Sequence, residues 1–272
     1  MAGGKHNRND APTEKQSIFY TRDYRHLPRP RLSMWFFVAL IVLPVLASIF
    51  LFYPRLSLAI STWVSGVITG NTGVSTSVIS SEFIPMIGPV YLVNIAGSLP
   101  TRVFSIINAV VSLAVLLAVG IFRKSGFRAF MIFLSMAMVI HLISSLFFTF
   151  FPEYFPYTLE NYSELYMEQQ IAIWLCIAGI SGFAISLIYS PLLAKLTAFF
   201  ATLAYSFVYG VVRYVIYLVI LHFFSSLYMA TLFFTLGVLF DFLQMVFIYI
   251  LFVQYASREF NSQKEGALWK WS

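Results

Sequence analysis

The ionisable side chains inside otherwise apolar stretches of this 272-residue chain include Cys176, His141, Arg213 and Asp241. A thiol beside a permanent positive charge favours the nucleophilic thiolate, and arginine cannot itself act as a base. Histidine exchanges protons near neutral pH, and an aspartate can orient an arginine. The four residues are therefore the candidate catalytic set for acyl transfer through a thioester, in which the guanidinium would stabilise the thiolate or the oxyanion.

The composition places these residues in a membrane. Mean hydropathy is +0.82, 60% of the residues are hydrophobic and 10% are charged, which excludes an ordinary soluble domain. A helix needs about 20 largely apolar residues to cross the hydrocarbon core. Six stretches meet this requirement: 34–53, 103–122, 130–151, 171–193, 196–224 and 227–256. We predict an all-α, polytopic integral membrane helix bundle with six transmembrane helices.

The distribution of basic residues predicts that both termini are cytosolic, because Lys and Arg resist translocation. Residues 1–33 form a basic tail, and Lys or Arg also follows the second, fourth and sixth spans. In contrast, 152–170 contains four glutamates and no basic residue. The expected organisation is a cytosolic tail at 1–33, a transmembrane domain at 34–256 with outer loops 54–102 and 152–170, and a second cytosolic tail at 257–272.

The first outer loop has a composition of its own. It begins with small polar residues near position 70 and is apolar from Phe83 to Ile95, where prolines and a glycine interrupt it. This apolar part is too short and too broken to span, so we expect an interfacial segment, a re-entrant piece or a short hairpin. It is compatible with a lid on the bundle and with a surface that receives a peptide or a glycan.

The depth of the ionisable groups suggests that they meet. Arg213 lies about 16 Å, and Asp241 about 21 Å, from the outer ends of two adjacent antiparallel spans. A charge in lipid costs several kcal/mol unless it has a partner, so an ion pair is predicted. His141 lies about 15 Å and Cys176 about 8 Å below the outer ends of their own spans. We expect all four to converge on one cavity in the outer half of the membrane.

Three segments resemble the C-terminal half of the exosortase/archaeosortase family. They are WLCIAGISGF (174–183), YSPLLAKLTAFFATLAYSFVYGVVRYVIYLVILHFF (189–224) and VLFDFLQMVF (238–247). The resemblance implies a polytopic cysteine transpeptidase or protease that processes C-terminal sorting tails on the outer side of the membrane.

The same resemblance assigns roles to residues of this chain. Cys176 matches the nucleophile of the family, and Arg213 lies in a setting like that of the family's arginine inside the next helix. The third polar position, where the family commonly has histidine or arginine, falls at or beside Asp241. The family often has Ser-Gly or Thr-Gly directly after its cysteine, whereas Ile177 and Ala178 follow here.

The leading expectation is an exosortase-like membrane cysteine peptidase or transpeptidase in a bacterial or archaeal cytoplasmic membrane, with its site facing outside. Its partners would be membrane lipids and a C-terminally tailed exported protein or polysaccharide-export components. The chain contains one cysteine and no C-x-x-C, H-E-x-x-H, P-loop or G-x-G-x-x-G motif. No cofactor, metal or nucleic-acid partner is therefore expected.

Two other classes of protein fit the same composition. A non-enzymatic subunit or scaffold of an envelope polysaccharide or secretion complex would use the Arg213–Asp241 pair for packing and loop 54–102 for partner contact. A transporter would use the pair in a substrate or proton path. The residues alone do not separate these classes.

Overall fold

The computed structural model describes residues 31–122 and 128–263 of the chain, so most of the two predicted basic tails lies outside the described residues. Within these ranges, six helices are long and apolar enough to cross a membrane. The predicted all-α class with six membrane-spanning helices is confirmed, and the protein is a membrane protein. The six helices are Leu32–Thr72, Arg102–Ile121, Arg128–Phe150, Leu159–Ser186, Leu192–Phe223 and Ser226–Glu259.

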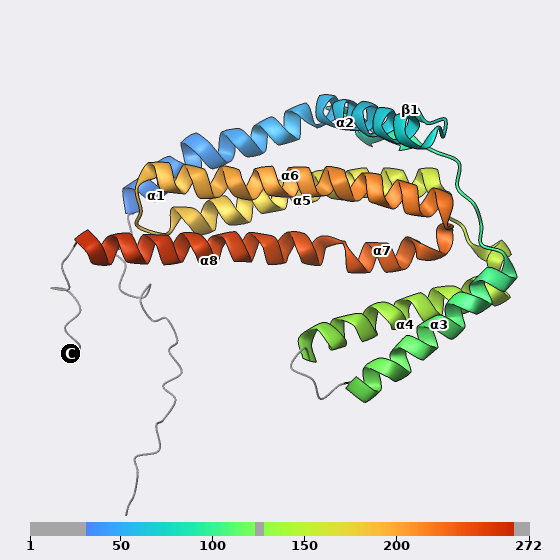
Figure 1. The fold of residues 1–272 in the computed structure, drawn as a ribbon. Helices are drawn as coiled ribbons and strands as arrows, with labels where there is room; N and C mark the ends of the chain where they lie inside the picture. The colour runs from blue at the N-terminus through green and yellow to red at the C-terminus, as the bar shows by residue number, and fades with distance from the viewer. Residues whose placement is uncertain (1–30, 123–127, 264–272) are drawn as a thin grey trace, which may run out of the picture.

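The bundle is built from long helices that lie side by side (Figure 1). The first helix combines α1 (Arg31–Phe37), the π-helical turn η2 (Val38–Val42) and α2 (Leu43–Thr72). It packs against α5 (Leu159–Ser186) and α6 (Leu192–Phe223), and α8 (Val238–Gln263) packs on both of these. We call the end at which α1 begins and α8 ends the terminal end, and the other the opposite end.

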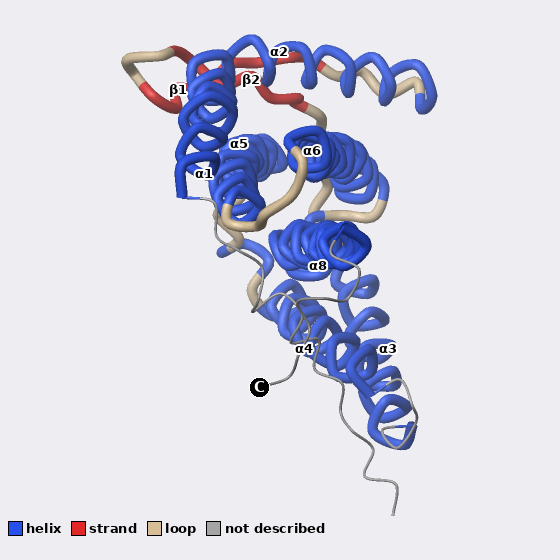
Figure 2. The backbone as a smooth tube through the Cα atoms, turned by 90° about the vertical axis from the view of Figure 1, so that its left-hand side faces the viewer, coloured by secondary structure: helices blue, strands red, loops and turns tan. Residues whose placement is uncertain are grey.

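Helix α2 changes direction at Pro54, which lies inside it. Proline removes one helical hydrogen bond and its ring displaces the preceding turn, so the helix bends there. After the bend, α2 lies across α5 and α6, which Figure 2 shows nearly end-on. The predicted first span, 34–53, stops at this bend. The predicted loop 54–102 is corrected in its first part, because helix continues to Thr72 and ends at Gly73 with a positive φ of 69°.

A two-stranded hairpin follows α2. Strands β1 (Ser77–Ile84) and β2 (Gly88–Asn94) pair antiparallel. A short hairpin was one of the three forms expected for this segment, and it does not add a seventh span. We call residues 55–72, 77–94 and 159–170 the platform; they are the second half of α2, the hairpin and the first turns of α5.

Side-chain hydroxyls hold the edge of β2 that faces away from β1. Ser57 Oγ accepts a bond from the Tyr91 amide at 3.1 Å, and Ser61 Oγ donates to the Tyr91 carbonyl at 2.9 Å. A strand edge otherwise leaves backbone groups unpaired, and burying them without partners is costly. The serines of α2 therefore fix the strand in place of a third strand.

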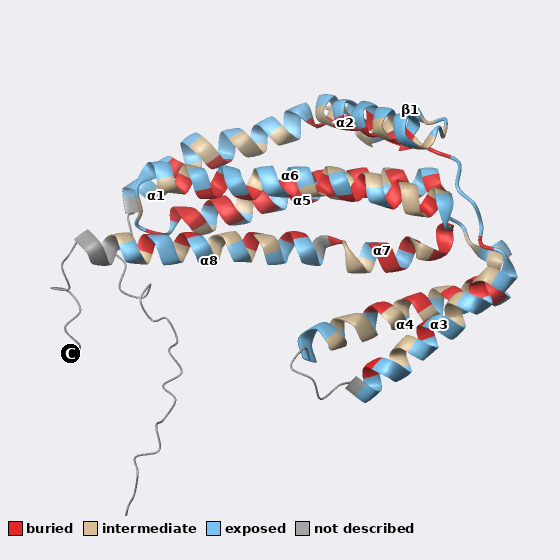
Figure 3. Ribbon diagram, viewed as in Figure 1, coloured by how far each residue is buried: buried red, intermediate tan, exposed pale blue. Residues whose placement is uncertain are grey.

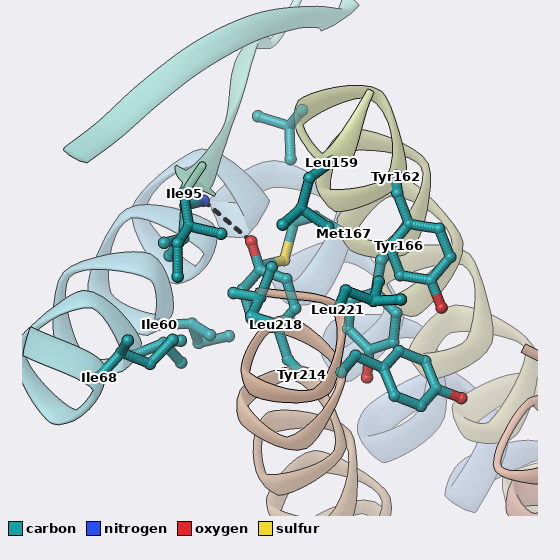
Figure 4. Packing of buried hydrophobic residues seen from close by; sticks show 14 of the residues in the cluster. Ile60, Ile68, Ile95, Leu159, Tyr162, Tyr166, Met167, Tyr214, Leu218 and Leu221 are labelled. Atoms are coloured by element: carbon teal, nitrogen blue, oxygen red, sulfur yellow. Dashed lines mark hydrogen bonds between the residues drawn. The ribbon is translucent and has the colours of Figure 1, made fainter. Parts of the chain in front are cut away.

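Val93, the next residue of β2 that faces away from β1, has its backbone bonded by hydroxyls of α5 and α6. The Tyr214 hydroxyl accepts a bond from the Val93 amide at 2.9 Å, and Ser163 Oγ donates to the Val93 carbonyl at 2.8 Å. Figure 4 shows the Tyr214 ring in the hydrophobic core beneath the platform, beside Leu218. The platform and the bundle therefore share one core.

Helices α3 (Arg102–Phe122) and α4 (Arg128–Phe150) form a separate antiparallel pair. They approach the other helices near η4 (Ser226–Tyr228) and α7 (Met229–Thr235) and diverge from α8 beyond that point (Figure 1). Figure 3 shows that few residues of this pair are buried, whereas α5 has a long buried face. Apolar side chains such as Val110 and Ile121 cover the exposed faces, as expected for contact with lipid.

Two predicted spans differ from the observed helices. The fourth span was predicted at 171–193, but the helix there, α5, begins at Leu159. Thr158 and Asn161 form a reciprocal cap at its start. The predicted loop 152–170 is therefore mostly helix. The first turns of α5 were not predicted as part of a span because their glutamates lower the apolar content of this segment. The sixth, 227–256, is divided into α7 and α8 by a break at Leu236 and Gly237.

Replacing Tyr214 with phenylalanine tests the docking of the hairpin. The Tyr214→Phe variant leaves the Val93 amide without its acceptor. We expect the free energy of unfolding to fall by about 1–3 kcal/mol, the cost of an unsatisfied buried donor. Unfolding in mixed detergent and SDS micelles, followed by tryptophan fluorescence, measures it. The control is Tyr189→Phe, the same change at a 48% exposed ring; equal stability of the two variants would contradict the assignment.

Candidate functional site

Arg213 lies on α6 with only 2% of its surface exposed, and its guanidinium contacts three other helices. Its Nη1 atom lies 2.7 Å from Asp241 Oδ2 on α8, which forms the predicted ion pair. On α5, Nε donates to the Tyr166 hydroxyl at 3.0 Å, and Nη2 donates to Gln170 Oε1. The side chain is held at both edges of its plane, which uses the forked geometry of arginine.

The same guanidinium also reaches the backbone at the α7–α8 break. Nη1 donates to the carbonyl of Leu236 and lies 3.2 Å from the carbonyl of Gly237. The last carbonyls of a helix have no partner within the helix, and inside a membrane no water replaces it. Arg213 therefore satisfies the backbone that the break leaves open.

Asp241 has two sources of stabilisation besides Arg213. It lies in the first turn of α8, where the helix dipole favours a negative charge. Ser206 on α6 also donates to its Oδ1 atom at 3.4 Å. The carboxylate is 1% exposed, so these contacts replace its hydration.

The break requires a glycine. A Cβ atom on Gly237 would lie 2.0 Å from the carbonyl oxygen of Phe233, which is backbone and cannot move aside. Gly210 on α6 is similarly restricted, since a Cβ there would meet the Gln170 amide nitrogen at 2.5 Å. Gly210 therefore lets Gln170, a partner of Arg213, approach α6 closely, and Gly237 lets the chain turn against the Phe233 carbonyl.

Aromatic rings enclose the ion pair. The guanidinium carbon lies 5.6 Å from the centre of the Tyr166 ring and 5.1 Å from that of Tyr209, within range of cation–π attraction. The cavity next to Arg213, lined also by Tyr217 and Phe233, has a volume of about 10 Å³. This is room for about one water molecule, so no substrate fits beside the guanidinium in this conformation.

His141 lies in a different cluster. Its Nδ1 is 3.0 Å from Thr231 Oγ1, its Nε2 is 3.3 Å from Asn108 Oδ1, and its ring stacks on Tyr228 at 4.9 Å between ring centres. A neutral ring with the proton on Nε2 satisfies both bonds, because the amide oxygen accepts and the threonine hydroxyl donates. His141 therefore joins α3 and α4 to η4 and α7, and does not contact Arg213.

Cys176 also lies apart from the ion pair. It is exposed on α5, six residues beyond Gln170 towards the terminal end. Six residues correspond to about 9 Å along the helix and about 120° around it. The expected convergence of four groups therefore yields a single pair, Arg213 and Asp241. The depth of Cys176 was misjudged because α5 begins at Leu159 rather than at position 171.

Sequence reasoning missed the partners of Arg213 on α5. Tyr166 and Gln170 lie in a segment that was expected to be a loop, although their spacing of four residues places them on one helix face. The isolated Gly237 in the last span was the available signal for the break. Among the described residues, no group of three His, Cys, Asp or Glu side chains could hold a metal ion.

The chain was compared with known protein-family models, with curated proteins and with solved structures, and no match was found in any of the three. The class that the fold defines is a six-helix membrane protein with a buried arginine–aspartate pair and an attached hairpin.

Substitution of Gly237 tests the close approach at the break. In Gly237→Ala, the methyl group meets the Phe233 carbonyl, and we expect a loss of at least about 1–3 kcal/mol of unfolding free energy. The control is Gly120→Ala on α3, where nothing lies within 4 Å of the added carbon. The same micelle titration measures both; a Gly237→Ala protein as stable as Gly120→Ala would show that the break is absent.

Removal of the guanidinium tests the ion pair. Arg213→Ala leaves the Asp241 carboxylate buried without its charged partner, and we expect a loss of about 3–5 kcal/mol. Arg55→Ala, at an exposed arginine of α2, should change stability by less than about 0.5 kcal/mol. The double variant Arg213→Ala/Asp241→Ala should lose less than the sum of the single variants. Strict additivity would show that the two side chains do not interact.

Proposed function

We propose that the protein is a non-enzymatic membrane subunit that holds a partner protein on its platform. The observation that carries the proposal is the occupancy of the Arg213 guanidinium, whose five acceptors are Tyr166, Gln170, Asp241 and the carbonyls of Leu236 and Gly237. Each nitrogen of this group is bonded to an acceptor of its own protein, and such a group serves packing. The non-enzymatic scaffold was one of the alternatives that the sequence left open.

The position of Cys176 favours the scaffold over the exosortase-like reaction that the sequence resemblance implied. That reaction needs the thiol next to the positive charge that stabilises the thiolate. Cys176 instead lies on the exposed surface of a membrane helix, beyond Gln170 and about 9 Å further along α5. Its surroundings suit a small apolar side chain.

The closed surroundings of the ion pair favour the scaffold over a transporter. A transport path through Arg213 and Asp241 would require water or substrate to reach these groups. The adjoining cavity of about 10 Å³ and the 2% exposure of Arg213 give no such access in this conformation. In transporters, the break in an interrupted helix often lines a binding site. Here the side chain of Arg213 occupies the break between α7 and α8 and bonds its carbonyls.

The platform supplies the surface for the partner. Basic residues such as Lys195 and Arg258 lie towards the terminal end, and Glu160 and Glu164 lie at the opposite end. By the positive-inside rule we assign the terminal end to the cytosol and the platform to the outer face of a cytoplasmic membrane. Trp63, 54% exposed on α2, belongs to this face.

Photo-crosslinking in intact cells tests the proposal. A benzophenone amino acid in place of Trp63 should give a protein adduct of one defined mass. The same amino acid in place of Val110, a 62% exposed residue of α3, should not give this adduct, because its neighbours are lipids. Because no chemistry at the thiol is involved, Cys176→Ser should leave the adduct unchanged. Absence of a protein adduct at position 63, or its loss in Cys176→Ser, would refute the proposed function.

A further inference from the structure

The two edges of the hairpin differ in how their backbone groups are satisfied. In an antiparallel pair, successive residues direct their N–H and C=O groups alternately towards the partner strand and away from it. Tyr91 and Val93 of β2 direct theirs away from β1, to the hydroxyls of the helices. The neighbouring residues of β2 therefore face β1, where Leu92 pairs with Ile79 and Val90 with Ser81.

It follows that Val78, Ser80 and Glu82 direct their backbone groups to the free edge of β1. Within residues 31–122 and 128–263, the sheet has two strands, and no helix, turn or hydroxyl bonds the backbone of these three residues on that side. Ser80 and Glu82 are exposed. The free edge therefore offers the donors and acceptors of Val78 and Ser80 to an extended chain, and Glu82 lies at its end, where the register shifts between Glu82 and Ile84.

Acidic side chains surround this edge. Glu82 lies on β1 itself, and Glu164 and Glu160 accept bonds from Ser81 on β1 and Asn94 on β2. Glu164 is four residues from both Glu160 and Glu168, so the three occupy one face of α5. The hairpin and residues 159–170 contain no Lys or Arg, and Arg55 is the single basic residue of the platform, so the platform carries a net negative charge.

We infer that the free edge of β1 binds an extended segment of the partner protein that carries Lys or Arg, by strand addition. Backbone bonds to Val78 and Ser80 would give affinity, and the glutamates would select basic side chains. The inference rests on the proposed function, because it names the chemistry of the partner that the platform holds.

A second copy of the chain is a poorer occupant of the same edge. Two β1 strands placed edge to edge would bring two sets of the same glutamates together. Arg55 is the single basic residue of the platform, against four glutamates, and it does not offset the repulsion between two such sets. A basic segment meets the same edge with charge complementarity instead.

Binding of two matched peptides to the full chain in zwitterionic nanodiscs tests the inference. The probes are fluorescein-labelled nonapeptides that alternate valine with lysine or valine with glutamate. The lysine peptide should bind at low salt at least about tenfold more tightly than the glutamate peptide, and added salt should weaken it. Equal binding of the two peptides, or a salt-resistant complex, would overturn the assignment.

One substitution separates backbone pairing from charge attraction. Ser80→Pro removes the central N–H of the free edge without removing a bond between β1 and β2. It should weaken the affinity for the lysine peptide by about tenfold. Ser80→Ala keeps the N–H and should bind as the unchanged protein does. Glu82→Gln should weaken binding about threefold or more. Similar binding by Ser80→Pro and Ser80→Ala would refute strand addition.

Two controls distinguish the failure of this inference from other outcomes. The Trp63 crosslink in the otherwise unchanged protein reports the proposed function, and the same crosslink should be weaker in Ser80→Pro, because the partner pairs with the free edge. If Ser80→Pro leaves both peptide binding and crosslinking unchanged, the platform holds its partner elsewhere and the inference fails alone. If light scattering shows a dimer that Ser80→Pro dissociates, the edge pairs with a second copy and the basic-segment assignment is wrong.

Discussion

The structure depends on one buried contact, the pairing of Arg213 with Asp241 at the break between α7 and α8. An isolated charge inside a membrane is costly, and so is a backbone carbonyl without a donor. The arginine removes both costs together, because it bonds the carboxylate and the carbonyls of Leu236 and Gly237. Tyr166 and Gln170 extend this arrangement to α5, so a single side chain connects the three central helices.

A second set of polar contacts joins the bundle to the platform through tyrosines. Tyr166 stacks on Tyr214 with 4.9 Å between ring centres, so the ring that contacts Arg213 packs on the ring whose hydroxyl holds β2. Both side chains lie in one hydrophobic core, with Tyr217 beside them. The position of the hairpin is therefore coupled by direct packing to the geometry of the ion pair.

The sequence predicted the class of fold and the ion pair because both follow from strong, local physics. Long apolar runs must span, and opposite charges at similar depth in adjacent helices must pair. The start of α5 was not predictable from apolarity, since its first turns are stabilised by a Thr158 cap and by burial under the hairpin. The places of His141 and Cys176 depend on helix rotation, which depth along a span does not determine.

Pro54 has a consequence for the membrane itself. The stretch from Leu32 to Tyr53 rises about 33 Å, close to the thickness of a hydrocarbon core, whereas α5 and α6, with 28 and 32 residues, measure about 42 and 48 Å. The additional length of α5 and α6 lies beside the second half of α2, which follows the bend. A thinner bilayer would withdraw from that half, and a thicker one would immerse its neighbouring carboxylates. The bend thus limits the part of the first helix that lies alongside α5 and α6 to about the thickness of one hydrocarbon core.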